Sequence, residues 1–250
     1  MTILTALLLF AAGVLTAMIN AVAGGGTFLS FGALTLVGLP PVVATATSSI
    51  IQFPGYVTST LAYWNDLKAF WRGALTLCVA SILGSLVGAW ILLQLDNSQF
   101  RALVPWLLVA ATALFAAGPR LKPKPKPGAE TAVGGAFGWV LQFVTSIYGG
   151  FFGAGGGVIM LATLSLSQSG DYHRFNALKN MLSTVIAAVA IVVFVAGGVV
   201  AWPQALVMIP GVAIGGWSGV WVAKRVPQTV MRAVVLAVGL FLAGYFFIIS

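Results

Sequence analysis

Two glycine triplets interrupt the most apolar parts of the 250-residue chain, and both have the chemistry to bind an anion. Glycine is a poor helix former, so each triplet predicts that one helix ends there and another begins. The first N–H groups of a helix lack partners within the helix and carry a partial positive charge, and glycine lets a ligand approach them closely. The triplets are Gly24, Gly25 and Gly26 in NAVAGGGTFL, and Gly155, Gly156 and Gly157 in FFGAGGGVIM.

A second set of polar residues follows each triplet. Thr47, Ser48 and Ser49 lie in ATATSSIIQFPG, and Lys179 and Asn180 lie in RFNALKNMLST. Their hydroxyl and amide groups can donate hydrogen bonds to an oxyanion. A lysine inside an apolar helix is costly to bury without a partner, and a substrate anion would serve as one. The alternative is that Lys179 extends its charge to the membrane interface.

The acidic residues indicate which chemistry to exclude. All four fall in expected loops, so no helix interior is predicted to carry the carboxylate on which many cation carriers and proton pumps rely. One histidine, His173, and one isolated cysteine, Cys78, do not make a nucleophile with its base or a metal cluster. We therefore expect no enzyme, no metal site and no cofactor. The acids are Asp66, Asp96, Glu130 and Asp171.

Composition decides what must position these residues. Of the chain, 60% is hydrophobic and 6% is charged, whereas soluble domains carry about 25% charged residues. This indicates an all-α integral membrane protein, because apolar runs long enough for spanning helices recur along the whole length. The expected segments are 2–22, 25–38, 44–63, 70–94, 99–117, 131–149, 154–167, 174–196, 202–223 and 229–249.

The chain is predicted to be an internal duplication. A shift of 131 residues places the first glycine triplet on the second, Trp71 on Trp202 and Arg101 on Arg232, without a gap. Each half then holds five helical segments, an odd number, so the two repeats have opposite orientations in the membrane. We expect a first repeat at 1–117, a basic Lys/Pro linker at 118–130 and a second repeat at 131–250, with helix breaks at the triplets.

The charge distribution predicts the orientation. The net charge of +8 is best explained by lysine and arginine in cytoplasmic loops, and the lack of a basic surface interleaved with aromatic residues excludes nucleic acid as a partner. With the linker in the cytoplasm and ten crossings, almost every basic residue lies on that side, and both termini lie outside. The lipid bilayer is the expected partner.

The length of the segment after each triplet favours a functional role for the glycines. Residues 25–38 would form roughly 21 Å of helix, at 1.5 Å per residue, against a hydrocarbon core of ~30 Å. The helix would therefore begin at depth, where irregular backbone must be enclosed by protein or line a watery cavity. The alternative is that the triplets only allow close helix packing, which is our interpretation of the spaced glycines 84, 88, 211, 215 and 219, within one chain or across a homodimer.

These motifs together resemble a known family. NAVAGGG, GFFGAGGG, ATATSS, NALKN and the basic central linker are similar to the sulfite exporter TauE/SafE family of membrane transporters, over nearly the whole chain. The resemblance implies transport of small sulfur-containing anions, such as sulfite, sulfoacetate or other organosulfonates, across the bacterial inner membrane, usually as export. By position, it implies that both triplets, Thr47–Ser49 and Lys179–Asn180 belong to the site.

The expected function is anion transport by alternating access, with the two repeats moving around a midplane site. A passive anion channel is the alternative, and it would conduct through a continuous open pore. An assembly subunit would not need duplicated helix breaks.

Overall fold

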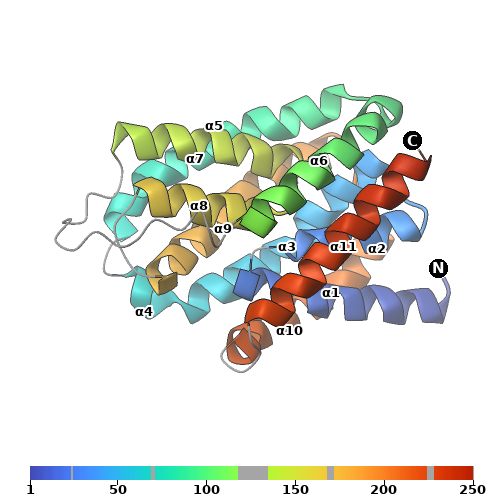
Figure 1. The fold of residues 1–250 in the computed structure, drawn as a ribbon, viewed down its shortest axis with the longest axis horizontal. Helices are drawn as coiled ribbons and strands as arrows, with labels where there is room; N and C mark the ends of the chain where they lie inside the picture. The colour runs from blue at the N-terminus through green and yellow to red at the C-terminus, as the bar shows by residue number, and fades with distance from the viewer. Residues whose placement is uncertain (24, 69–70, 118–134, 168–171, 224–227, 250) are drawn as a thin grey trace.

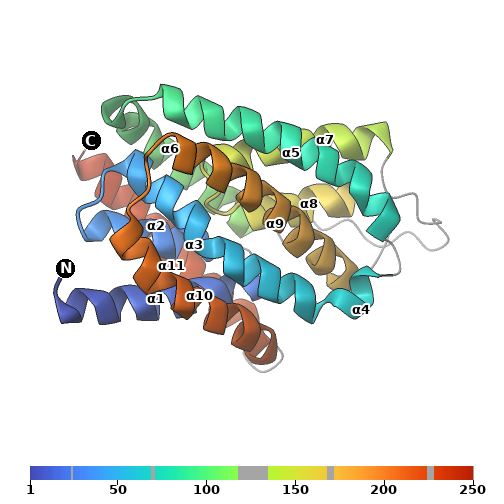
Figure 2. The same cartoon turned by 180° about the vertical axis from the view of Figure 1, so that it is seen from behind.

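The structure is a computed structural model in which the described residues, 1–23, 25–68, 71–117, 135–167, 172–223 and 228–249, form eleven α-helices. Figures 1 and 2 show them gathered into one bundle. In chain order they are α1 (Ile3–Ala23), α2 (Thr27–Leu36), α3 (Pro41–Ala62), α4 (Trp64–Leu67), α5 (Trp71–Gln94), α6 (Asn97–Ala117), α7 (Ala136–Phe151), α8 (Gly156–Ser167), α9 (Tyr172–Ala196), α10 (Trp202–Ala223) and α11 (Gln228–Ile249).

All ten expected segments correspond to helices, with one addition. The addition is α4, a single turn at the end of α3. The segment expected from residue 44 begins three residues earlier, at Pro41, because the fixed φ of proline and its missing N–H suit the first turn of a helix. The linker at 118–130 and Gly24 lie outside the described residues.

The helices run alternately along the bundle. Both termini lie at one end, and α4 lies at the other, next to the beginning of α9 (Figures 1 and 2). At the end with the termini, α6 begins with a capping box: Asp96 accepts from the Gln99 N–H at 2.8 Å, and Gln99 Oε1 accepts from the Asp96 N–H at 3.2 Å. Hydrogen bonds from the Ser98 hydroxyl and the Gln99 N–H lower the pKa of Asp96.

The most extensive contacts join helices from opposite halves of the chain. Helix α1 packs along α10, and α5 packs along α7, while α3 and α9 meet in the centre. Glycines make the two outer pairings possible. A Cβ added at Gly88 would overlap the carbonyl oxygen of Ile147, and one added at Gly215 would overlap that of Val14. This confirms that the spaced glycines serve close packing within the chain.

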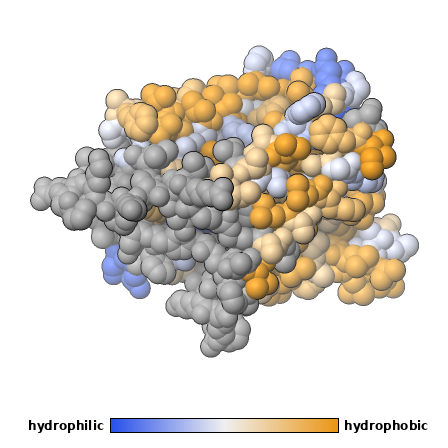
Figure 3. Space-filling model, in the orientation of Figure 1, coloured by the Kyte–Doolittle hydropathy of each residue, from blue (hydrophilic) through white to orange (hydrophobic). Residues whose placement is uncertain are grey.

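The outer surface is apolar. Large hydrophobic side chains are exposed along α1, α5, α6, α10 and α11, including Ile3, Leu83 and Phe241. On the face in Figure 3, apolar residues cover most of what is not grey, and hydrophilic ones gather at two opposite edges. Within the described residues, three spans are long and apolar enough to cross a membrane: Ile3–Ala21, Ala74–Gln94 and Arg174–Ala196. Such a surface requires lipid, so the protein is a multi-pass membrane protein.

An aromatic cluster holds the short helix α2 in the interior. Phe31 of α2 meets the ring of Phe152 at 5.4 Å and that of Phe246 on α11 at 5.7 Å. All three side chains are at least 98% buried. Because α2 has only ten residues, roughly 15 Å of helix, it depends on this packing rather than on its own hydrogen bonds.

Candidate functional site

The beginning of α2 is held by the last turns of α1. The Gly26 N–H, one of the donors left free at the helix start, donates to the side-chain oxygen of Asn20 at 2.8 Å. A Cβ at Gly26 would overlap the carbonyl oxygen of Thr16, so only glycine fits. The amide nitrogen of Asn20 donates to Gln52 Oε1 and, at 3.3 Å, to the Tyr56 hydroxyl, both on α3.

Lys179 completes this cluster from α9. Its side chain is 1% exposed, and its ammonium donates to the backbone carbonyl of Asn20 at 3.0 Å. This carbonyl lies in the last turn of α1, where helix carbonyls lack internal partners and carry a partial negative charge. The interfacial alternative for Lys179 is therefore wrong, because the charge points inward to a helix terminus.

The beginning of α8 is built differently. Gly153 and Gly155 have φ of 70° and 71°, in the left-handed region that favours glycine. The Tyr148 hydroxyl donates to the Ala154 carbonyl at 2.5 Å, and the Gly156 N–H donates to the Gly153 carbonyl at 3.0 Å. A Cβ at Gly155 would lie 3.2 Å from the ring of Phe28 on α2, so the two glycine turns approach each other.

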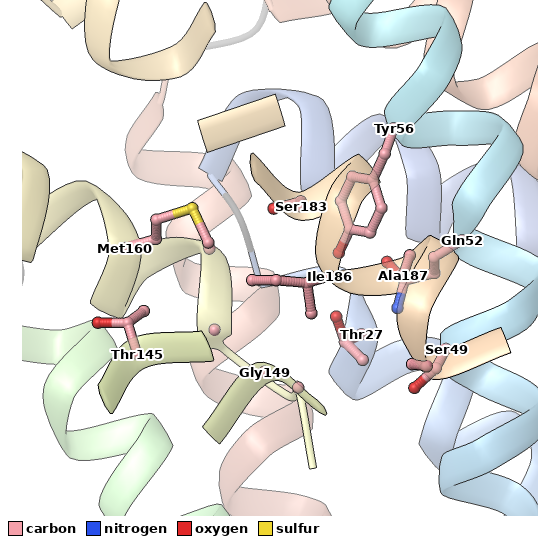
Figure 4. A pocket seen from close by; sticks show the side chains of 14 residues that line it. Thr27, Ser49, Gln52, Tyr56, Thr145, Gly149, Met160, Ser183, Ile186 and Ala187 are labelled. Carbon is pink, nitrogen blue, oxygen red and sulfur yellow. The ribbon is translucent and has the colours of Figure 1, made fainter. Parts of the chain in front are cut away.

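A small cavity lies where the two helix starts meet (Figure 4). Thr27, the first residue of α2, and Gly156 and Gly157, the first residues of α8, all line it. Its volume of about 40 Å³ exceeds the ~10–15 Å³ that one water molecule needs. The other lining residues are Ser49, Gln52, Tyr56, Thr145, Gly149, Gly153, Met160, Ser183, Ile186, Ala187 and Ala190.

The lining that the described residues form mixes polar and apolar groups and carries no formal charge. Hydroxyl and amide groups come from α2, α3, α7 and α9, and Figure 4 shows Thr27 and Tyr56 turned toward the middle of the view. Hydroxyl groups, amide N–H groups and the starts of two helices are donors suited to an anion, and a carboxylate to repel it is absent from the lining.

The predicted site residues divide into those at the cavity and those behind its wall. Ser49, Gly156 and Gly157 line the cavity. The Thr47 hydroxyl accepts from the Ala201 N–H at 3.0 Å, and the Ser48 hydroxyl pairs with that of Ser30 at 2.6 Å, so both hold other helices. The residues buried outside the lining are Gly25, Gly26, Gly155, Lys179 and Asn180, whereas Gly24 lies outside the described residues.

Two side chains at the site have polar groups without a partner among the described residues. Asn180 is 1% exposed, and neither its amide oxygen nor its amide nitrogen forms a hydrogen bond. Ser183, 7% exposed and three residues later, lines the cavity with no hydrogen bond to its hydroxyl. Residues three apart lie on the same side of a helix. Asn180 and Ser183 therefore bring their unpaired donor groups to the same side of α9.

Sequence reasoning missed most of the lining. Thr27 directly follows the first triplet, and this adjacency was a usable signal. Tyr56, Thr145 and Ser183 are ordinary polar residues in helices, and their place depends on how the helices rotate against one another. Gln52, on α3, both accepts from Asn20 and lines the cavity.

Comparison with known proteins finds similarity to membrane transporters along most of the chain. The family described as "Sulfite exporter TauE/SafE" matches residues 9–246. A "Probable membrane transporter protein" of Haemophilus influenzae is 24% identical over 92% of this chain and 89% of its own length. The "Probable membrane transporter protein YfcA" of Escherichia coli is 25% identical over 92% and 85%. "Probable membrane transporter protein YunE" of Bacillus subtilis is 23% identical over 85% and 84%.

Proposed function

The chain belongs to the TauE/SafE family of sulfite exporters, and from this premise we propose that it carries small sulfur-containing anions across the bacterial inner membrane. Sulfite, sulfoacetate and other organosulfonates are the proposed substrate class, and export is the proposed direction. The relatives are named as membrane transporters, and this agrees with a membrane protein that moves a solute.

The observation that carries the proposal is the cavity between the beginnings of α2 and α8. Helix starts that meet inside a membrane protein are a recurring way to bind anionic groups of a substrate. The proposed site consists of both glycine triplets with Thr47, Ser48, Ser49, Lys179 and Asn180, now joined by Thr27 and Ser183. Lys179 contributes positive potential from behind the wall, because its ammonium is bound to the Asn20 carbonyl.

The helix contacts support the proposed inverted repeat. A shift of 131 residues carries α1 onto α7 and α5 onto α10. The contact of α1 with α10 thereby becomes the contact of α7 with α5, and these are the two outer pairings. We assign residues 1–117 and 131–250 to the two repeats, which would move against each other to give alternating access.

The ends of the bundle support the proposed orientation. Lys68 and Arg174 lie at the end with α4, opposite the two termini (Figures 1 and 2). Basic residues mark the cytoplasmic side of bacterial membrane proteins. The end with α4 is therefore proposed as cytoplasmic, together with the linker at 118–130, and both termini as external.

A passive channel is the second candidate for the same family and the same cavity. A carrier saturates and passes through a closed state, whereas a channel conducts along a continuous path. The small volume of the cavity favours the carrier.

Uptake of ³⁵S-labelled sulfite and of sulfonates into proteoliposomes tests the proposal. We expect saturable flux for the wild-type protein. Lys179→Ala and Gly25→Leu are expected to insert into the membrane but to lose flux. Gly244→Ala is the control, because a Cβ there meets nothing within 4 Å. Undiminished flux in both site variants would exclude the proposed site, and non-saturating flux would favour the channel.

A further inference from the structure

The two helix starts at the cavity are not equivalent. At α2, the Gly26 N–H is already bonded to the side-chain oxygen of Asn20 at 2.8 Å, so an amide oxygen of the chain itself holds the place of an anion. None of the described glycines of the first triplet lines the cavity. Asn20 is fixed in turn by Gln52, Tyr56 and Lys179. The Gly26 N–H at the beginning of α2 is therefore already occupied by the chain's own Asn20.

The beginning of α8 is open. Gly153, Gly156 and Gly157 line the cavity, and the Gly157 N–H has no hydrogen-bond partner among the described residues. Gly157 is half-buried, and its N–H is one of the first in α8, which have no acceptor within the helix, so it is available to an acceptor in the cavity. Position 20 of the first half corresponds to Phe151 in the second, which has no polar side chain to take the place of Asn20.

Ser183 points to the same place independently. Its side chain is 93% buried, lines the cavity and makes no hydrogen bond with the described residues. It belongs to α9, so it is a donor from a different element than the α8 start. The Gly157 N–H and the Ser183 hydroxyl both lack acceptors among the described residues, and both residues line the same cavity. Two such donors specify one position for an anion, and hydrogen bonds from them to a charged group are strong ones.

We infer that the cavity binds its anion at the beginning of α8, with the Gly157 N–H and the Ser183 hydroxyl as donors, while Asn20 acts as a permanent internal ligand at the beginning of α2. The ligand class is a small oxyanion, such as sulfite or a sulfonate headgroup. The inference rests on the proposed function, and it makes binding asymmetric in a chain whose two halves correspond.

Uptake of ³⁵S-sulfite into proteoliposomes tests the role of Ser183. Ser183→Ala is expected to raise the half-saturating concentration about tenfold or more, the effect of losing one hydrogen bond to a charged group. Ser183→Thr keeps the hydroxyl and is expected to restore most of the affinity. Thr184→Ala is the matched control, because its hydroxyl bonds to the Asn180 carbonyl at 2.9 Å outside the lining. It is expected to match the wild type.

Localisation of selenite, a heavier analogue of sulfite, by anomalous scattering tests the asymmetry directly. We expect a peak within hydrogen-bonding distance of the Gly157 nitrogen and the Ser183 hydroxyl. A peak at Gly26, or unchanged half-saturation in Ser183→Ala, would overturn the inference and leave the proposed function standing. If the wild-type protein carries neither sulfite nor a sulfonate, the proposed function fails and this inference falls with it.

Discussion

Four hydrogen bonds in the interior converge on Asn20. Its side chain accepts from Gly26 and donates to Gln52 and Tyr56, and its backbone carbonyl accepts from Lys179. One residue thereby links the last turns of α1 to α2, α3 and α9. In an apolar interior, each of these polar groups would be costly without its partner.

Asn20→Ala is expected to lower the free energy of unfolding by about 1–3 kcal/mol, because the Gly26 N–H would remain buried without an acceptor. Thermal unfolding in detergent measures the effect. The control is Asn97→Ala, which removes one hydrogen bond, to the Val42 N–H, near the surface. Equal unfolding temperatures for the two variants would contradict the central role of Asn20.

For single residues, the sequence predicts which polar side chains are buried in the same region, but it does not predict their hydrogen-bond partners. Thr47 and Ser48 were expected at the substrate, but a hydroxyl in an apolar bundle also bonds to the nearest backbone or side chain, here Ala201 and Ser30. Lys179 was recognised as a buried charge in need of a partner. Its partner, the carbonyl of Asn20, carries no signal in the sequence because every residue has a carbonyl.

At the scale of helices, glycine faces determine which helices meet. Gly84 and Gly88 let α7 approach α5, and Gly215 and Gly219 let α10 approach α1. Backbones that come this close gain van der Waals contact, which is a main source of helix association in lipid.

Gly88→Ala and Gly215→Ala are each expected to destabilise the protein by about 1–3 kcal/mol, because a methyl group forces the paired helices apart. Gly244→Ala, in an open part of α11, is expected to be neutral or slightly stabilising, since alanine is the better helix former. Thermal unfolding of the three variants in one detergent is the measurement. Equal stability of all three would show that close approach is not needed.

The helices themselves were largely predictable, because apolar runs broken by polar loops mark them. Helix α4 was not expected, since Trp64–Leu67 is one turn in a polar stretch whose helical form depends on the preceding α3. The rotation of α3, α7 and α9 about their axes decides which polar side chains reach the cavity. Mean hydropathy does not encode this rotation, which explains why Tyr56 and Thr145 were missed.

At the scale of the whole molecule, the proposed orientation is testable by labelling. In a Cys78→Ser background, Ser98→Cys and Lys68→Cys place thiols at exposed positions on opposite ends of the bundle. A membrane-impermeant maleimide is expected to label Ser98→Cys in intact spheroplasts and Lys68→Cys only after lysis, because basic residues gather on the cytoplasmic side. The reverse pattern would invert the proposed topology.

The sequence predicts a duplication, but it does not predict that helices from the two halves of the chain pair with one another. Matching glycines and tryptophans at one shift predict two similar units, and they do not show whether each unit packs mainly on itself. The pairings of α1 with α10 and of α5 with α7 depend on contacts between residues far apart in the chain.

This exchange has a consequence for biosynthesis. When α1 and α5 leave the ribosome, α10 and α7 have not yet been made. The faces of α1 and α5 that contact α10 and α7 in the finished protein are therefore without these neighbours at first. Contacts between distant parts of a chain form late and leave intermediates exposed. The helices within residues 1–117 therefore complete their packing only after α10, near the end of the chain, has been translated.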